Sequence, residues 1–357
     1  ECGNRECGNR ESWNPKYETL NIEYQNIRMT RKKYNWAILG CGKIARKFSS
    51  DLKLLPNARL YAAAARDLAR AREFAAEFGY EKAYGSYEEM VADPAVDVVY
   101  VATPHSHHHD HVLLCVNAGK AVLNEKAFAL TLREAQEMVN KAREKKVFLM
   151  EAFWTRFQPS FQKALEVVKS GDLGALKVVR SDFAFHAPKD PEKRLFNVAL
   201  GGGSLLDIGI YPVFAALSAL GIPQDIKALA TFAPTGAEEG IAFTFRYSGG
   251  ELASLYSSLG AYSFVTTDYN CERGTVQLGR RWQGPTTVDV WHEGGREEHY
   301  AFQTEGFGYQ HEAAHVMECL DAGKNESDMM PLDFSLAMME TLDRIRREAG
   351  IIFPGRD

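Results

Sequence analysis

A glycine-rich turn near the N-terminal end of the chain has the first pattern that could do chemistry. The sequence Gly-Cys-Gly-Lys-Ile-Ala begins at Gly40, directly after the short apolar run Trp36–Leu39, and opens a helical pattern. The first glycine permits a tight turn, the second lets the backbone approach a pyrophosphate, and the alanine lets a helix pack closely on a strand. Free N–H groups at the start of that helix favour an anion. The turn therefore predicts a dinucleotide site with these contact residues: Gly40, Cys41, Gly42, Lys43 and Ile44.

The end of the next apolar run, Leu60–Ala65, bears on which dinucleotide binds. Sites for NAD usually place Asp or Glu here, about 20 residues after the glycines, to bind the ribose hydroxyls. In this chain the small Ala65 leaves room for a 2′-phosphate, and Arg66 can pair with that phosphate and stack on adenine. Asp67 follows one residue later and is expected to cap the next helix. The sequence favours NADP, with NAD as the second choice.

A histidine-rich segment follows the third apolar run, Val96–Val101. His107 and His111 are four residues apart on a predicted helix, a spacing that a metal site can use. The segment also lies at the carboxyl end of a predicted strand, where doubly wound sheets hold their ligands. We therefore assign no residue to a metal and expect the segment to contact the cofactor or the substrate. The assigned residues are Thr103, Pro104, His105 and His108.

Three further residues could carry acid–base chemistry. Lys126, beside Glu125, comes just after the apolar run Ala121–Asn124, so both are expected at the cleft edge of the sheet, in reach of the cofactor. A lysine there can bind a substrate hydroxyl and share its proton if the lysine pKa is lowered. Asp207 and Tyr211 are four residues apart near the start of a predicted helix and lie on one of its faces. Taken singly, they could equally be a surface lysine, a helix-capping aspartate and a core tyrosine.

Together these motifs resemble the Gfo/Idh/MocA oxidoreductase family. The resemblance rests on the glycine turn, on Thr-Pro-His-x-x-His at 103–108 and on Ala-Gly-Lys-Ala-Val-Leu-x-Glu-Lys at 118–126. Residues 149–157 and 202–211 are similar to the branch that contains dimeric dihydrodiol dehydrogenases and NADP-dependent D-xylose dehydrogenases. The resemblance covers about residues 34–353. It implies hydride transfer from a CH–OH group of a small cyclic polyol, a xylose-like aldopyranose or a trans-dihydrodiol to nicotinamide.

The resemblance also implies roles for the three acid–base residues. Tyr211 would be the acid/base, Lys126 would lower its pKa and orient the substrate, and Asp207 would bind a substrate hydroxyl. The chain departs from the usual Glu-Lys-Pro of the family at Ala127, which removes the proline, relaxes the backbone and leaves the amine. Many members carry histidine in place of the tyrosine, whereas the dihydrodiol branch carries tyrosine.

Aromatic faces suit the C–H surface of a ring, and an arginine can bind oxygens, so a second group is expected to contact the substrate. Packing between domains is the alternative role for these side chains. The group consists of Trp154, Arg156, Phe157, Phe185 and His186. Loops such as Gly260–Tyr262, Arg280–Gly284 and Glu305–Tyr309 are expected to shape the pocket, in positions that the sequence does not give.

Two other functions stay open at this point. Some relatives are NAD-dependent sugar or inositol dehydrogenases, and others hydrolyse glycosides through transient oxidation by bound NAD. A non-catalytic cofactor-binding regulator would be expected to lack the pair Lys126 and Tyr211.

The elements that must position these residues fall into two groups. From Tyr34 to about Glu151, short apolar runs alternate with helical patterns, which predicts a Rossmann-type doubly wound parallel sheet. Beyond this point several runs alternate apolar with polar residues, which predicts an α+β domain with a large, mostly antiparallel, open-faced sheet. We expect a dinucleotide-binding domain over 29–151 and a substrate-binding and dimerisation domain over 152–357, whose final helix packs back on the first. The open face predicts a homodimer or higher homo-oligomer.

The composition restricts the partners and the compartment. The 357 residues carry a formal net charge of −5, which argues against nucleic acid as a partner because such a surface needs clustered excess Lys and Arg. No apolar run approaches the roughly 20 residues needed to cross a bilayer, so we expect no membrane partner. The six cysteines form no CxxC pair, which favours free thiols and a cytoplasmic location over a disulfide framework.

The first 28 residues differ from the rest of the chain. The sequence Glu-Cys-Gly-Asn-Arg occurs twice, at 1–5 and 6–10, and Met29 opens the segment before the first strand pattern. The segment lacks the long apolar stretch of a signal peptide. We interpret residues 1–28 as an extension that lies outside the fold.

Overall fold

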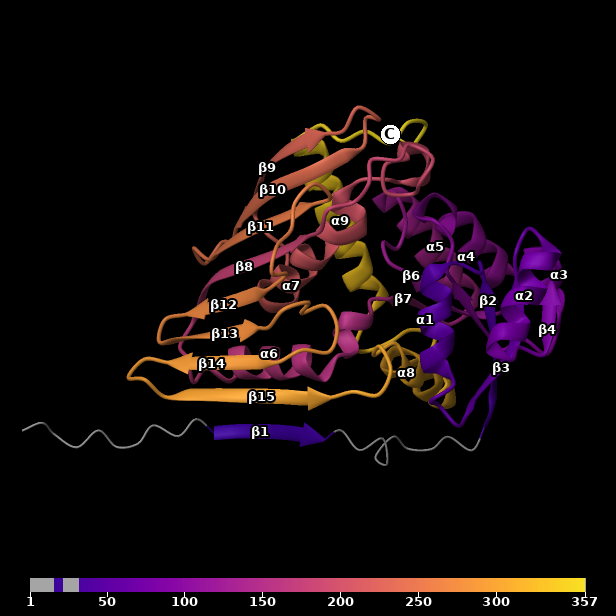
Figure 1. Ribbon diagram of the computed structural model, residues 1–357, viewed down its shortest axis with the longest axis horizontal. Helices are drawn as coiled ribbons and strands as arrows, with labels where there is room; N and C mark the ends of the chain where they lie inside the picture. Colours follow the sequence, from indigo (N-terminus) through magenta and orange to yellow (C-terminus); the bar gives the residue numbers. More distant parts are fainter. Residues whose placement is uncertain (1–15, 22–31, 357) are drawn as a thin grey trace, which may run out of the picture.

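The computed structural model describes residues 16–21 and 32–356 and divides them between two sheets (Figure 1). The first sheet has six parallel strands in the order β4-β3-β2-β5-β6-β7. Its strands are β2 (Tyr34–Leu39), β3 (Ala58–Ala64), β4 (Lys82–Tyr84), β5 (Val98–Val101), β6 (Ala121–Glu125) and β7 (Leu149–Ala152). The strand order reverses between β2 and β5, which confirms the predicted Rossmann-type sheet.

Crossover helices connect the strands of the parallel sheet. They are α1 (Lys43–Leu52), α2 (Leu68–Phe78), α3 (Tyr87–Ala92), α4 (His108–Asn117) and α5 (Leu132–Lys145). The side chain of Asp67 accepts a hydrogen bond from the backbone N–H of Ala69 at 2.9 Å, so it caps α2 as predicted. Phe48 of α1 stacks on Tyr100 of β5 with ring centroids 3.8 Å apart. This contact sets the position of α1 and therefore of the glycine turn that precedes it.

The second sheet has nine strands in the order β1-β15-β14-β13-β12-β8-β11-β10-β9. It is mostly antiparallel, as predicted, with parallel pairing between β8 and β11 and between β1 and β15. Its strands are β1 (Lys16–Asn21), β8 (Leu176–Ala184), β9 (Asp225–Phe232), β10 (Glu238–Arg246), β11 (Leu252–Ser258), β12 (Thr267–Cys271), β13 (Gly274–Leu278), β14 (Val288–His292) and β15 (Glu297–Gln303).

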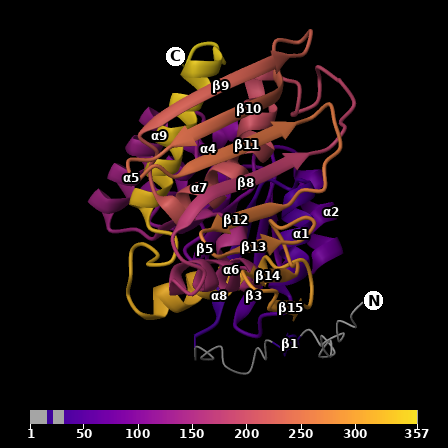
Figure 2. The ribbon, with the colours of Figure 1, turned by 90° about the vertical axis from the view of Figure 1, so that its left-hand side faces the viewer.

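Helices cover one face of this large sheet. They are α6 (Pro159–Ser170), α7 (Ile210–Leu220) and α9 (Leu332–Ala349), and α8 (Gln310–Asp321) lies against α1. Figure 2 looks onto the other face, where the strands lie in front of the helices of the described residues. The sheet is therefore open-faced, as its alternating sequence pattern predicts.

The structure differs from the prediction within the N-terminal segment. Residues 16–21, which we expected outside the fold, form β1 and pair with β15 in parallel register. The physical reason is that β15 without β1 is an edge strand, whose free N–H and C=O groups accept an extended segment. The other residues of the predicted extension, 1–15 and 22–28, lie outside the described residues.

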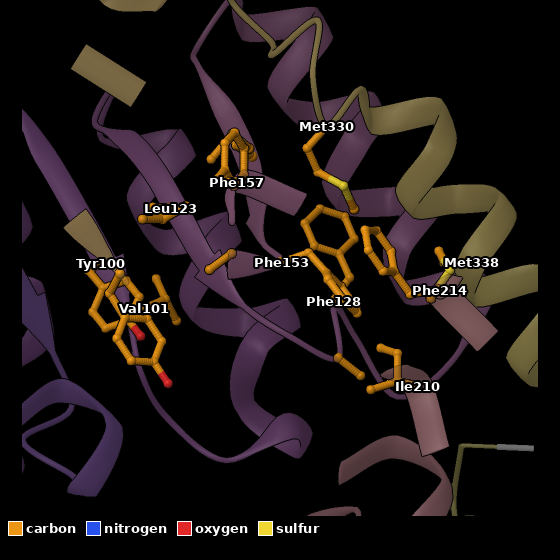
Figure 3. Packing of buried hydrophobic residues seen from close by; sticks show 14 of the residues in the cluster. Tyr100, Val101, Leu123, Phe128, Phe153, Phe157, Ile210, Phe214, Met330 and Met338 are labelled. Atoms are coloured by element: carbon orange, nitrogen blue, oxygen red, sulfur yellow. The ribbon is translucent and has the colours of Figure 1, made fainter. Parts of the chain in front are cut away.

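One continuous apolar core joins the two sheets. Phe153, directly after β7, stacks on Phe214 of α7 with ring centroids 4.0 Å apart, and Phe128, Met330 and Met338 surround them (Figure 3). The final helix α9 contacts both α5 and β7 of the first half and β9 of the second. Because well-packed interiors deform little, residues from the two halves can meet in a defined geometry.

The most apolar helical segment belongs to this core. Val198–Leu220 is long and apolar enough to cross a membrane, but 89% of its most apolar stretch is buried within the fold. The helix that was predicted to carry Asp207 and Tyr211 begins instead with a π-helical turn, Leu205–Gly209, before α7 starts. π-helical turns often occur at functional sites.

Candidate active site

A cavity of about 730 Å³ lies at the carboxyl edge of the parallel sheet, between the two halves of the chain. The glycine turn forms one end, and residues of the π-helical turn and α7 form the other. Twelve of the thirteen residues predicted to bind cofactor line it: Gly40, Cys41, Gly42, Lys43, Ile44, Ala65, Arg66, Thr103, Pro104, His105, Glu125 and Lys126.

The glycine turn forms a cradle that fits a pyrophosphate. Gly40 has φ +102°, and a Cβ on it would lie 2.9 Å from Cγ2 of Thr103. Helix α1 begins at Lys43, and no side chain among the described residues caps its first turn. Its first backbone N–H groups therefore remain available to an anion in the cavity.

Cations surround this end of the cavity. Lys43, Lys47, Arg66 and Arg70 all line it. Arg70 also donates to the carbonyl oxygen of Cys41 at 2.9 Å, which holds α2 against the turn. Arg66 lies at the end of β3 with its side chain exposed. The charges can therefore complement the phosphates of a dinucleotide.

The histidine segment divides into two environments. His105 lines the cavity, and burial lowers its pKa well below the ordinary value, so it is neutral. His108 is the predicted cofactor residue that does not line the cavity. Its two ring nitrogens lie 2.8 Å from the carbonyl oxygens of Thr103 and Ala127, so it connects the turn after β5 to the loop after β6. The ring of His111 lies 5.6 Å from that of His107, and its Nδ1 is 3.0 Å from Oγ1 of Thr103.

The three predicted acid–base side chains meet at the other end of the cavity. Lys126 follows β6, Asp207 lies in the π-helical turn, and Tyr211 lies in the first turn of α7. The Nζ atom of Lys126 lies 3.7 Å from Oδ1 of Asp207 and 4.9 Å from the centroid of the Tyr211 ring. It also donates to the backbone carbonyl of Asp207. The Lys126–Ala127 peptide bond is cis.

Burial and neighbouring charges set the ionisation of this group. Burial lowers the pKa of Lys126, opposed by the negative charges of Asp207 and Glu125. Burial would raise the pKa of Asp207, but the positive charges of Lys126 and Arg194 outweigh it and hold that pKa below its ordinary value. The site therefore contains a carboxylate between two cations.

The phenol of Tyr211 has a different electrostatic environment. Burial raises its pKa, and a hydrogen bond from Nε1 of Trp154 to the phenol oxygen, 2.9 Å long, acts in the opposite direction. The sequence interpretation attributed the lowering of this pKa to Lys126. The structure shows that Trp154 also acts to lower this pKa, because an N–H donor stabilises the phenolate.

Sequence reasoning assigned no role to several residues that line the cavity, Lys47, Arg70, Tyr87 and Arg194 among them, and expected Tyr309 only as part of a loop that shapes the pocket. Arg194 lies in the irregular segment before the π-helical turn and binds Oδ1 of Asp207 at 2.7 Å. Tyr309 stacks on Trp154 with ring centroids 4.5 Å apart and an angle of 16° between the planes. Arg194 lies in a segment without helix or strand periodicity, so only its residue type could have drawn attention to it, whereas Tyr309 belongs to the loop Glu305–Tyr309 that was expected at the pocket.

Of the five residues predicted to contact the substrate, Trp154 lines the cavity and the other four do not. Arg156 instead donates to the carbonyl oxygen of Met329 at 2.8 Å, and Phe157 packs against His315. Phe185 packs against Phe183, and the ring of His186 faces Tyr262. The short 3₁₀ helix Trp154–Phe157 has about three residues per turn and sends neighbouring side chains in different directions.

Comparisons with known proteins agree with this architecture. Residues 34–153 match the oxidoreductase family with an NAD-binding Rossmann fold, and residues 161–277 match the GFO/IDH/MocA C-terminal domain. The chain is 40% identical over 331 residues to trans-1,2-dihydrobenzene-1,2-diol dehydrogenase of Mus musculus. That match covers 89% of this chain and 98% of the mouse protein.

Solved structures share the fold. Aldose-aldose oxidoreductase from Caulobacter crescentus, complexed with glycerol, has a TM-score of 0.82 at 25% identity, covering 89% of this chain and 98% of that one. A 3-ketoreductase from Actinomadura kijaniata, solved with NADP, has a TM-score of 0.81 at 23% identity, covering 89% and 98%. Levoglucosan dehydrogenase, solved with NADH, has a TM-score of 0.81 at 18% identity, covering 89% and 97%. The last two show likeness of fold alone.

Proposed function

The chain belongs to the Gfo/Idh/MocA oxidoreductase family and is an NAD(P)-dependent dehydrogenase that acts on CH–OH groups, and we propose that it uses NADP to oxidise a small cyclic vicinal diol. A trans-dihydrodiol is the leading substrate, in line with the name of the mouse relative. Cyclic polyols and xylose-like aldopyranoses carry the same reacting group and form the wider substrate class.

One observation carries this proposal: the residues that suit a dinucleotide and the residues that suit proton transfer line the same cavity. The glycine cradle and its cations line one end, and Lys126, Asp207 and Tyr211 line the other. A dinucleotide with its pyrophosphate on the turn before α1 would extend toward the acid–base group. Proximity of that kind is what hydride transfer needs.

The preference for NADP is supported by the end of β3. The small side chain of Ala65 and the exposed side chain of Arg66 both line the cavity. Arg70, in the first turn of α2, lines the same cavity. A 2′-phosphate would meet positive charge here, whereas the 2′-hydroxyl of NAD would find Asp67 already bound to the backbone of α2.

The residues of this chain would perform the proton transfer. Nicotinamide, when bound, supplies the hydride acceptor. Tyr211 takes the proton of the substrate hydroxyl at its phenol oxygen, and the Trp154 N–H at 2.9 Å stabilises the phenolate that does so. The Lys126 ammonium, 4.9 Å from the phenol ring centroid, adds positive charge beside it and donates to the substrate oxygen.

Asp207 would orient the substrate. Its carboxylate stays ionised because Arg194 lies 2.7 Å and Lys126 lies 3.7 Å from Oδ1. An ionised carboxylate accepts hydrogen bonds strongly, so it suits the second hydroxyl of a vicinal diol. The stacked rings of Trp154 and Tyr309 offer an apolar wall for the C–H face of the substrate ring.

We also propose a homodimer or higher homo-oligomer in the cytoplasm. Leu229, Ala242 and Tyr256 are register partners on three adjacent strands of the open sheet face, and all three are exposed. An apolar row of this kind is usually covered by a partner. The four described cysteines, Cys41, Cys115, Cys271 and Cys319, are free thiols, which supports a reducing compartment.

A substrate panel tests the proposed function. Trans-dihydrodiols, inositols and aldopyranoses are each scanned with NADP and with NAD while reduction of the cofactor is followed by absorbance. The proposal predicts the highest kcat/KM for a trans-dihydrodiol with NADP. Preference for NAD overturns the cofactor assignment, and preference for an inositol or aldose overturns the leading substrate. Product formation from a glycoside without net cofactor reduction would indicate the hydrolytic alternative.

A further inference from the structure

Three side chains of the kinds that bind metals meet outside the cavity, at the far end of α8. His315 and Cys319 are four residues apart on one face of α8, and Asp328 approaches them from the loop that follows. The Nε2 atom of His315 lies 3.3 Å from Sγ of Cys319 and 3.8 Å from Oδ1 of Asp328. All three ligand atoms lie within 4.8 Å of one another. None of these residues has a part in the proposed hydride transfer.

Two of the spacings, 3.3 and 3.8 Å from Nε2 of His315, are close to those within one small coordination sphere. Tetrahedral zinc with Zn–S near 2.3 Å and Zn–N or Zn–O near 2.1 Å places its ligand atoms about 3.4 to 3.6 Å apart. We propose that His315, Cys319 and Asp328 bind one divalent cation of the zinc class, with water as the fourth ligand. A nitrogen, a sulfur and an oxygen ligand form a set of borderline softness that suits zinc better than magnesium or calcium.

The protonation of His315 suits such a site, and Cys319 would have to lose its proton on binding. Burial lowers the pKa of His315, so its imidazole is neutral, which is the form that binds a metal. Burial and the charge of Asp328 raise the pKa of Cys319 to about 11. A bound cation would stabilise the thiolate, and the thiol proton would leave to solvent as the metal–sulfur bond forms.

The residues around the three proposed ligands can accommodate a bound cation. Asp328 uses Oδ2 for its ion pair with Lys324, at 2.9 Å, and keeps Oδ1 on the side of His315. The Oγ atom of Ser327 lies 2.7 Å from Nε2 of His315 and would give up that contact. Its oxygen also accepts from the backbone N–H groups of Met329 and Met330, at 3.0 and 2.9 Å, so it would remain bonded.

The metal would fasten α8 to a loop that supports the active site. The carbonyl oxygen of Asn325 accepts from the backbone N–H of Leu149 in β7 at 3.2 Å. The carbonyl oxygen of Met329 accepts from Arg156, which belongs to the same 3₁₀ helix as Trp154. Binding would therefore stabilise the folded protein through the loop 324–331, because a ligand of the native state raises its stability.

Cobalt(II) is a suitable probe because it takes tetrahedral sites and its bond to a thiolate absorbs in the near ultraviolet. The full-length protein, freed of metal by a chelator, is titrated with Co²⁺ and then with competing Zn²⁺. We expect one equivalent to bind with a sulfur–cobalt band that zinc abolishes. The Cys319→Ser variant should lose the band, and Asp328→Asn should weaken binding by about tenfold or more.

Matched variants separate this site from the other cysteines and from misfolding. Cys271→Ser should keep the band, because this free thiol is not part of the cluster. Lys324→Gln should tighten binding by a few fold, since it removes the competing cation from Asp328. Asp328 is exposed, so its variant is expected to fold and circular dichroism can check this. A wild-type protein without the band, or a band that survives in Cys319→Ser, overturns the proposal.

Discussion

The two ends of the cavity are built in different ways. At the cofactor end, residues 40–44 are consecutive and present a turn and backbone N–H groups to the ligand. At the reacting end, Lys126 and Asp207 are 81 positions apart in the chain and meet as buried charged side chains. A backbone cradle depends on local conformation, whereas a cluster of buried charges depends on how separate elements pack. The two ends should therefore respond differently to substitution.

The largest expected effect is at the reacting end. Tyr211→Phe and Lys126→Met should each lower kcat by about 100-fold or more, because they remove the proton acceptor and the adjacent cation. Steady-state kinetics with the best substrate measures this loss. For Tyr211→Phe, the cofactor Kd, measured by fluorescence quenching, should stay near the wild-type value because the phenol oxygen serves only the reacting end. Turnover close to wild type in both variants would contradict the catalytic assignment.

A substitution in the glycine turn should act on the opposite end. Gly40→Ala places a Cβ 2.9 Å from the Thr103 side chain at φ +102°, so cofactor affinity should fall by about tenfold or more. Isothermal titration with NADP measures it. Gly79→Ala is a matched control, since Gly79 has φ +80° but a Cβ there meets nothing within 4 Å. Equal loss of affinity in both variants would point to general instability rather than to the cradle.

A substitution at Arg66 should distinguish the binding of NADP from the binding of NAD. Arg66→Ala should raise the KM for NADP by about tenfold and leave the KM for NAD nearly unchanged, because only NADP carries the 2′-phosphate. Arg72→Ala, at an exposed arginine of α2 that does not line the cavity, provides the comparison. An unchanged KM for NADP in Arg66→Ala would remove the support for NADP.

The pH dependence tests the contact between Trp154 and Tyr211. Burial raises the phenol pKa and the indole N–H opposes this rise, so Trp154→Phe should raise that pKa further and move the rising limb of kcat for oxidation to higher pH by roughly one unit. At neutral pH, which lies below this pKa, the variant would then be about tenfold slower, and activity should recover as the pH rises. Tyr309→Phe keeps the ring stacked on Trp154 and should not move the profile. A Trp154→Phe profile that coincides with wild type would show that the hydrogen bond does not tune the phenol.

The smallest expected effect concerns β7, which pairs with β6 beside the reacting end. Burial raises the pKa of Glu151, at the end of β7, from 4.5 to about 7. Between these values the unfolded chain loses this proton while the folded chain keeps it, so stability falls as the pH rises through this window. Glu151→Gln lacks the ionisation, and its Tm relative to wild type should increase by a few degrees between about pH 5 and about pH 8. A constant difference in Tm across this range would contradict the raised pKa.

Much of the fold could be predicted because its signals are local. The apolar run at Val98–Val101 is fully buried in the parallel sheet, and Asp67 caps α2 as its position suggests. The three-residue strand Lys82–Tyr84 is too short to show a periodicity and was missed. The family, the fold class and the dehydrogenase activity agree with the comparisons, whereas the residue roles stay predictions.

The sequence by itself determined the cofactor cradle, since a glycine turn between a strand and a helix specifies backbone geometry within a few residues. It also set Asp207 and Tyr211 four residues apart, and both line the cavity although a π-helical turn replaces the start of the expected helix. Only the tertiary structure decided that Arg194 reaches Asp207, that Trp154 donates to Tyr211 and that Arg156 turns away from the cavity. These contacts join segments with no periodic relation to each other, and their geometry follows from the packing of the two halves around one core.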